Sequence, residues 1–100
     1  MIGFNWQRCI RLGTGHPSSA MKQPPSAYLR RFTYDCLAHN DHINGLLAQM
    51  VGADRMVIGS DYCFDMGLDD PVGTVERIPG LSAEQRAEVL GGTPAKLLGL

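Results

Sequence analysis

A short apolar run between turn residues, Arg55-Met56-Val57-Ile58-Gly59, restricts the possible folds of this chain more than any other feature. Apolar strands without alternation are typical of parallel sheets that are covered on both faces. A second segment of strand length, Arg31 to Leu37, is rich in aromatic and β-branched residues. About eighteen residues separate the two, which is the length of a right-handed βαβ crossover. The sequence therefore predicts an α/β fold with two parallel strands.

The segment between these strands has the pattern of an amphipathic helix. Asn40 is a candidate N-cap, because its side chain can accept from the free amides of the first turn. Gly52 is expected to end the helix. Its apolar residues fall at helical spacing and predict a core-facing stripe made up of Ile43, Leu46, Leu47, Met50 and Val51.

Three further helices are expected after the second strand. A helix over 70–78 begins with an Asp-Pro pair, which suits an N-cap and a first helical position. A helix over 82–90 begins with the Ser-Ala-Glu-Gln spacing of a capping box. The glycine pair 91–92 is expected to break it, and a last short helix is expected over 93–98.

The whole chain of 100 residues has the size of one small domain. Residues 1–25 are expected to form a loop-rich lead-in, since glycine and proline recur there, with at most a short helix over Ile2 to Cys9. Residues 26–100 are expected to hold the βαβ unit and the carboxyl-terminal helices. Ser26 is a candidate N-cap for one or two helical turns.

Composition excludes several classes of protein. No apolar run approaches the roughly 18 residues that span a bilayer, and Met1 does not begin a signal-peptide pattern, so membrane association and secretion are not expected. Three cysteines cannot all pair within one chain, and none stands in a C-x-x-C motif. A reduced, cytoplasmic protein is expected, and zinc fingers are excluded.

The net charge of −1 is unevenly distributed. Residues 1–40 hold five basic residues and one acidic residue, whereas residues 41–100 hold four basic and nine acidic ones. A basic front can attract an anionic partner. A solvated surface is the simpler interpretation, and nucleic acid is not expected as a partner, because the cations form no stripe. They are Arg8, Arg11, Lys22, Arg30 and Arg31.

Asp61 directly follows the apolar run, and functional groups of parallel α/β sheets gather past the carboxyl ends of the strands. A carboxylate there can ligate a divalent metal or accept a proton from a metal-bound water. It can equally cap a turn, and the pattern leaves both interpretations open. At the end of the first segment, His39 and His42 have the spacing of a metal pair, but solvated histidines are the simpler interpretation. Cys36 and Cys63 are expected to be small buried core residues rather than nucleophiles.

Three segments resemble the carboxyl end of the amidohydrolase-related family, and within it the branch of aminocarboxymuconate-semialdehyde decarboxylases. They are Pro25 to Asp35, Val51 to Gly67 and Leu90 to Leu100, and the most specific part is Gly59-Ser60-Asp61-Tyr62-Cys63-Phe64-Asp65-Met66-Gly67. The resemblance implies a metal-bearing (β/α)₈ TIM barrel. The chain would supply its carboxyl-terminal quarter, with strand seven over 32–37 and strand eight over 55–59, as an incomplete barrel.

The resemblance also implies roles for two residues. Asp61 matches the strand-eight aspartate that ligates zinc or another divalent ion and helps to activate its water. Phe64 matches an aromatic residue that lines the substrate pocket. Family members decarboxylate or hydrolyse small carboxylates without an organic cofactor. The family's His-x-His and later histidines have no counterpart here, Cys63 stands where proline is usual, and Thr93-Pro94 replaces an Asn-Ala type pair.

Two functions are therefore expected as alternatives. The chain is the carboxyl-terminal part of a metal-dependent decarboxylase or hydrolase of small carboxylates, inactive alone, because a catalytic zinc takes about three protein ligands. Alternatively it is a non-enzymatic module that self-associates or binds a larger barrel protein, because two parallel strands leave exposed edges. A barrel needs roughly 250 residues, so the length favours a missing barrel segment or a homo-oligomer.

Overall fold

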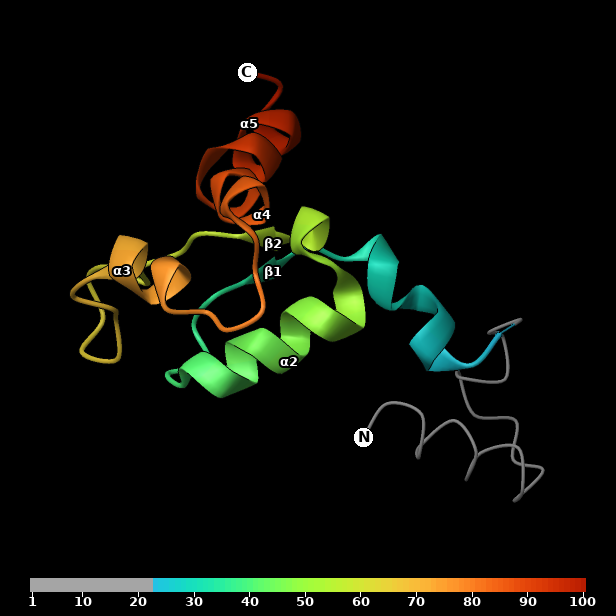
Figure 1. The fold of residues 1–100 in the computed structure, drawn as a ribbon, viewed down its shortest axis with the longest axis horizontal. Helices are drawn as coiled ribbons and strands as arrows, with labels where there is room; N and C mark the ends of the chain where they lie inside the picture. The colour runs from blue at the N-terminus through green and yellow to red at the C-terminus, as the bar shows by residue number, and fades with distance from the viewer. Residues whose placement is uncertain (1–22) are drawn as a thin grey trace. The chain divides into compact units, whose positions relative to one another are not determined.

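The computed structural model describes residues 23–100, which fall into two compact units divided between Phe32 and Thr33 (Figure 1). The first contains the 3₁₀ helix η2 (Pro25–Arg31). Its N-cap is Pro24, which provides no side-chain cap, and Pro25 occupies the first turn with the fixed φ that suits it. The prediction that Ser26 caps this helix is therefore wrong. The expected short helix over 2–9, most of the lead-in, and the cations Arg8, Arg11 and Lys22 lie outside the described residues.

The predicted parallel strand pair is confirmed, but both strands are shorter than expected. β1 (Tyr34–Asp35) pairs with β2 (Met56–Val57), with Tyr34 opposite Met56 and Asp35 opposite Val57. A 3₁₀ turn, η3 (Ala53–Arg55), immediately precedes β2 and connects it to the helix before it. Met56 is fully buried, whereas Val57 is only half-buried, so β2 is not covered on both faces.

The helix α2 (Asp41–Val51) begins and ends where the sequence predicts. The Asn40 side chain accepts from the N–H groups of His42 and Ile43 at 2.9 and 3.1 Å, and Gly52 ends the helix at a φ of 89°. Both features depend only on neighbouring residues. The Asn40 N-cap stabilises the helix by about 1 kcal/mol.

The buried face of α2 differs from the predicted stripe. Of the predicted residues, Val51 is buried, but Leu47 is only half-buried and Ile43, Leu46 and Met50 are exposed. The residues that face the interior are small or polar, namely Asn44, Gly45, Ala48 and Val51. A Cβ on Gly45 would lie 2.9 Å from Pro79 Cγ. The helix therefore lies too close to the segment around Pro79 for a larger side chain at position 45.

Two further helix starts follow their predicted caps. In α3 (Pro71–Glu76) the Asp70 carboxylate accepts from the Gly73 N–H at 2.9 Å. In α4 (Ala83–Ala87) the Ser82 hydroxyl accepts from the Gln85 N–H at 3.1 Å, and the Gln85 side chain accepts from the Ser82 N–H at 2.9 Å. The capping box is therefore complete.

The glycine pair 91–92 does not break the helix, contrary to the prediction. A π-helical turn, η4 (Glu88–Gly92), joins α4 to α5 (Thr93–Leu98), and Gly92 itself has helical φ and ψ. The Thr93 N–H donates to the Glu88 carbonyl, so the Val89 carbonyl loses its α-helical partner. Pro94 has no N–H to replace it. The Val89 carbonyl instead accepts from the Ile58 N–H at 3.1 Å, which ties the helix to the backbone just after β2.

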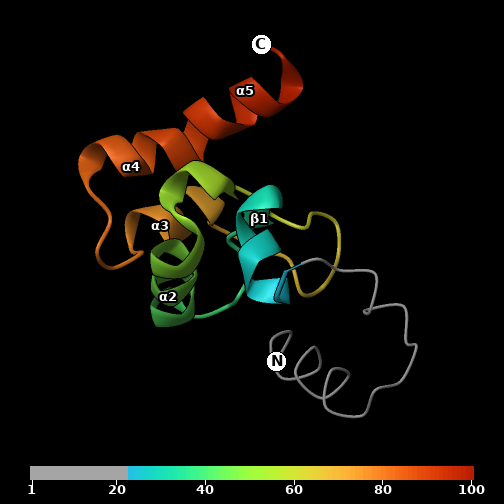
Figure 2. The ribbon, with the colours of Figure 1, turned by 90° about the vertical axis from the view of Figure 1, so that its right-hand side faces the viewer.

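In the second unit the strand pair lies between α2 on one side and the continuous helix of α4 and α5 on the other (Figures 1 and 2). The core between them consists of side chains that are at most 1% exposed, including Val51, Met56, Val75, Ile78 and Val89. Within residues 23–100 no helix is long and apolar enough to cross a membrane.

Candidate functional site

The loop that carries Asp61 is closed on itself by backbone hydrogen bonds. The Leu68 N–H donates to the Ser60 carbonyl at 2.8 Å, and the Phe64 N–H donates to the Asp61 carbonyl at 3.0 Å. A Cβ on Gly67 would lie 2.9 to 3.1 Å from the carbonyl oxygens of Ser60, Asp61 and Phe64. These oxygens are backbone atoms that cannot rotate away, so the loop requires glycine at this position.

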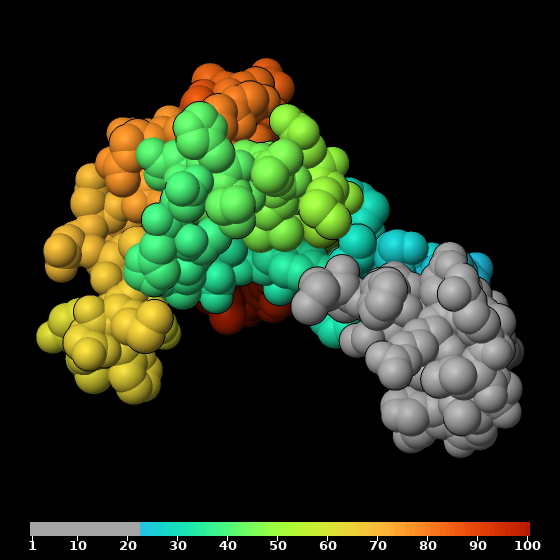
Figure 3. Space-filling model, turned by 90° about the horizontal axis from the view of Figure 1, so that it is seen from below, coloured from blue at the N-terminus to red at the C-terminus, as the bar shows by residue number. Residues whose placement is uncertain are grey.

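Asp61 lies in the loop four residues after Val57, the last residue of β2, and its side chain is available. Its φ is 54°, in the left-handed region that Asp tolerates better than most residues. It is exposed, and its carboxylate makes no hydrogen bond or ion pair with any described residue. Every residue from Asp61 to Met66 is exposed, and in Figure 3 this yellow loop projects from the orange and green helices of its unit. Phe64 is 69% exposed, so it lines no enclosed pocket within the described residues.

The carboxyl end of β1 lies beside that of β2. A Cβ on Gly59 would lie 3.2 Å from Asp35 Cβ, so the ends of the two strands are in direct contact. The Asp35 carboxylate is occupied locally, since it accepts from the Leu37 N–H at 3.2 Å.

Cys36, the next residue, is only 1% exposed, and its Sγ donates to the Val57 carbonyl at 3.3 Å. Burial, and to a smaller extent the negative charge of Asp35, raises the pKa of the Cys36 thiol to about 11. A thiol with this pKa is not a nucleophile at neutral pH. Cys36 is therefore a core residue, as expected. The same expectation is wrong for Cys63, which is exposed in the loop after β2.

The histidine pair gains no support as a metal site. His39 and His42 are both exposed, and His39 adopts a left-handed φ of 54° before the helix begins. Among residues 23–100, no three His, Cys, Asp or Glu side chains gather closely enough to hold a metal ion. A catalytic zinc takes about three protein ligands, so the described residues alone do not fit one.

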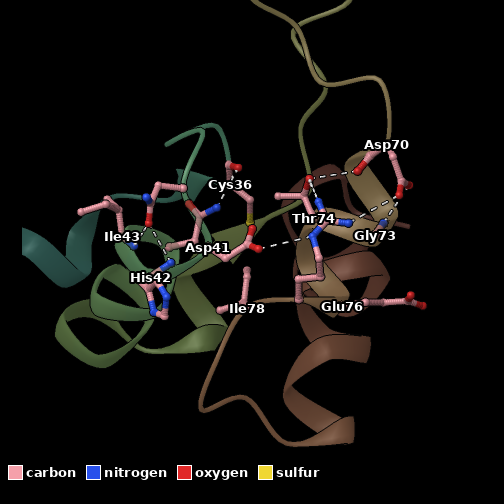
Figure 4. Close-up of polar contacts among 12 residues, drawn as sticks. Cys36, Asp41, His42, Ile43, Asp70, Gly73, Thr74, Glu76 and Ile78 are labelled. Atoms are coloured by element: carbon pink, nitrogen blue, oxygen red, sulfur yellow. Dashed lines mark hydrogen bonds and ion pairs between the residues drawn. The ribbon is translucent and has the colours of Figure 1, made fainter.

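Polar contacts between α2 and α3 fix the far end of the Asp61 loop (Figure 4). Arg77 Nε donates to Asp41 Oδ2 at 3.3 Å, and Arg77 Nη2 donates to Thr74 Oγ1 at 3.3 Å. Arg77 also pairs with Asp70, the N-cap of α3, at 3.7 Å. The helix that follows the loop is thereby held against α2.

Two comparisons with known proteins identify the family of this chain. Residues 5–100 match the family model of the amidohydrolases. The chain belongs to the amidohydrolase family. Over 76 residues it is 30% identical to the 2-amino-3-carboxymuconate-6-semialdehyde decarboxylase of Dictyostelium discoideum. The matched region covers 76% of this chain and 21% of that protein. The family resemblance inferred from the motifs is confirmed, and this amidohydrolase chain spans about a fifth of its relative's length.

One feature of this amidohydrolase chain escaped the sequence reasoning. Arg55 and Thr93 each hold a buried polar atom without a hydrogen-bond partner, and both line one cavity. The position of Arg55 at the start of an apolar run could have indicated this feature, because a charged group next to a buried strand is costly unless it is paired or hydrogen-bonded. Thr93 gave no signal, because its burial depends on the π-helical turn.

Proposed function

We propose that this chain is the carboxyl-terminal part of a metal-dependent amidohydrolase barrel that decarboxylates or hydrolyses small carboxylates. The position of Asp61 carries the proposal. It lies past the carboxyl end of a strand in a parallel pair, where α/β barrels collect their functional groups. Its carboxylate has no partner among the described residues, so it is available to a ligand.

The proposal assigns Asp61 one ligand position in a metal centre whose other ligands lie outside the described residues. Phe64, three residues further along the same loop, is proposed to contact the substrate. Its 69% exposure supports this role, because an aromatic side chain without a packing partner is available to a ligand. Neither residue performs catalysis in the isolated chain under this proposal.

The DNA upstream of Met1 provides the first test. We expect an in-frame continuation that encodes a His-x-His motif, and a stop codon directly upstream would contradict the proposal. In the longer chain, Asp61→Asn is expected to lower the rate of decarboxylation by more than about 100-fold. Mutating residues that only hydrogen-bond to metal ligands already lowers activity by about 10–100-fold. Asp65→Asn, an exposed carboxylate in the same loop, is the matched control and is expected to stay near wild-type activity.

The isolated chain of 100 residues gives the second test. Metal analysis with and without added zinc, together with a decarboxylation assay, is expected to find neither stoichiometric zinc nor turnover. Tight stoichiometric zinc binding accompanied by decarboxylation in this chain alone would overturn the proposal.

A non-enzymatic module that self-associates is the second candidate. The exposed apolar residues of α2 favour it, because Ile43, Leu46 and Met50 are 50 to 65% exposed on one helix. Contiguous apolar patches on soluble proteins commonly mark interaction sites. In this case the longer reading frame would be absent and the chain would form a stable oligomer.

A further inference from the structure

The carboxyl end of β2, which leads to Asp61, is held by side chains as well as by its ladder with β1. The ladder ends with Asp35 opposite Val57. One residue further along, the Cys36 Sγ–H donates to the Val57 carbonyl at 3.3 Å. The Cys36 carbonyl in turn accepts from Asn44 Nδ2, in α2, at 3.2 Å. Asn44 is therefore linked through Cys36 to the last residue of β2.

The three residues between β2 and Asp61 are each held by a contact. The Ile58 N–H donates to the Val89 carbonyl at 3.1 Å. Gly59 packs directly against β1, since a Cβ at this position would lie 3.2 Å from a side-chain atom of that strand. The Ser60 carbonyl accepts at 2.8 Å from the backbone N–H that closes the loop. A shift at the end of β2 is therefore passed on to Asp61.

Asn44 is a costly residue for a position in the core. It is fully buried, and in the described part of the chain its Oδ1 has no hydrogen-bond partner. A buried polar atom without a partner lowers stability. A leucine, which has the same branched shape, would avoid that cost. The amide at this position is therefore explained by its bond to the Cys36 carbonyl rather than by the stability of the core.

We propose that Asn44 is a positioning residue for Asp61. It fixes the Cys36 carbonyl, and the Cys36 thiol then fixes the Val57 carbonyl four residues before Asp61. The thiol keeps its proton at neutral pH, because its pKa is about 11, so it remains a donor. This role rests on the proposed function, in which Asp61 is a metal ligand. Residues that orient metal ligands commonly change metal affinity or activity by about 10–100-fold.

NMR spectra of the full chain test the positioning without any measurement of activity. Asp61 has a φ of 54°, and a positive φ gives a strong intraresidue NOE between the amide and Cα protons. Asn44→Leu keeps the branched shape but removes the donor. It is expected to weaken this NOE and to shift the amide resonances of residues 57–61. Asn40→Ala, which removes the N-cap of the same helix, is the matched control. It is expected to lower the thermal midpoint and to leave the Asp61 NOE unchanged.

Cys36 offers a second and smaller pair of variants. Cys36→Ala removes the donor to the Val57 carbonyl and is expected to cause the same changes at Asp61 as Asn44→Leu. Cys36→Ser keeps a donor and is expected to retain the wild-type NOE. An Asp61 NOE and amide resonance that stay unchanged in folded Cys36→Ala and Asn44→Leu would overturn the proposal.

The longer chain separates this role from the proposed function itself. At equal metal content, Asn44→Leu is expected to lower kcat about tenfold, whereas Asn40→Ala is expected to stay near wild type. Full activity of Asn44→Leu beside an active wild type would overturn the positioning role. A wild-type longer chain with neither metal nor activity would instead contradict the proposed function, and the NMR spectra would still decide whether Asn44 positions Asp61.

Discussion

At the scale of single residues, Gly67 controls the loop that carries Asp61. Gly67→Ala places a Cβ against three backbone carbonyl oxygens, so the loop backbone must shift. We expect a loss of about 1–3 kcal/mol in the free energy of unfolding, together with changed amide shifts over residues 60–68. Gly91→Ala is the matched control, because no atom lies within 4 Å of its Cβ position. It is expected to stabilise the helix by up to about 1 kcal/mol in urea unfolding.

Cys36 and Cys63 are expected to differ in reactivity, because one is buried and the other is exposed. Cys63 is exposed, whereas burial holds the pKa of Cys36 at about 11. Timed alkylation with iodoacetamide at pH 8, followed by peptide mass spectrometry, is expected to label Cys63 at least tenfold faster. Equal rates at the two thiols in the folded chain would contradict this assignment.

The same shift gives a pH dependence. The Cys36 thiol has a pKa of about 11 in the folded chain against 9.0 ordinarily, so the unfolded chain loses this proton first as the pH rises. Stability is therefore expected to fall from about pH 9 to pH 11, and Cys36→Ala is expected to lose this part of the pH dependence. Thermal unfolding of both variants over this range measures the difference.

Residue-level features were predictable where their cause is local. The caps at Asn40, Asp70 and Ser82 follow from side chains that bond amides two or three positions away. Ser26 failed as a cap because Pro25 next to it begins the helix. The burial of Asn44 was not predictable, since its Nδ2 donates to the Cys36 carbonyl at 3.2 Å across the crossover.

At the scale of elements, Arg86 joins three segments. Its Nε donates to the Glu76 carbonyl at 3.0 Å, Nη2 to that of Ile78 at 3.2 Å and Nη1 to that of Leu81 at 2.6 Å. The three nitrogens of the Arg86 guanidinium fork donate to carbonyls at and after the end of α3. The single ammonium group of a lysine cannot donate to all three carbonyls at once. Arg86→Lys is expected to lower the free energy of unfolding by about 2 kcal/mol in urea unfolding.

Arg31→Lys is the control for Arg86, since its cation lies over the Tyr28 ring at 4.7 Å and a lysine keeps that contact. A change within about 0.5 kcal/mol is expected. If Arg86→Lys were equally mild, the three carbonyls would be satisfied without the fork, which would contradict its role in holding α3 to α4.

Element order and type were predictable, but boundaries and faces were not. The crossover length and the apolar run were enough to predict the parallel pair. Strand length depends on how many residues find ladder partners, and only two residue pairs do so here. The core-facing side of α2 depends on Pro79, which lies far along the chain from Gly45. The π-helical turn depends on Pro94 and on the distant Ile58 N–H, which periodicity does not report.

At the scale of the whole molecule, the apolar face of α2 leads to a test of association. Leu46 is 54% exposed between Ile43 and Met50 on the same helix. Under the second candidate function, size-exclusion chromatography with light scattering is expected to give a mass above the 10.9 kDa monomer, and Leu46→Lys is expected to shift it toward the monomer. Leu100→Lys is the control, because Leu100 is 92% exposed at the end of the chain. A monomeric wild type would contradict the association.

The family was accessible from sequence, whereas a complete site was not. The run from Gly59 to Gly67 pointed to the family, and the match over residues 5–100 confirms it. At the last position of the run, three carbonyl oxygens leave no room for a Cβ. A metal centre needs several ligands from different strands, and among residues 23–100 no three His, Cys, Asp or Glu side chains lie close enough together to hold a metal ion. The role of Asp61 therefore stays a prediction.

The π-helical turn also sets how this chain tolerates changes of length. Thr93 stacks over Glu88 with five residues to the turn, whereas an α-helix needs only four, so the turn absorbs one surplus residue. Deleting Gly91 would restore α-helical spacing and keep Thr93 over Glu88, in its buried position. The Val89 carbonyl would then meet Pro94, which has no N–H, and would stay available to the Ile58 N–H. The chain is therefore expected to tolerate the loss of one residue at this turn.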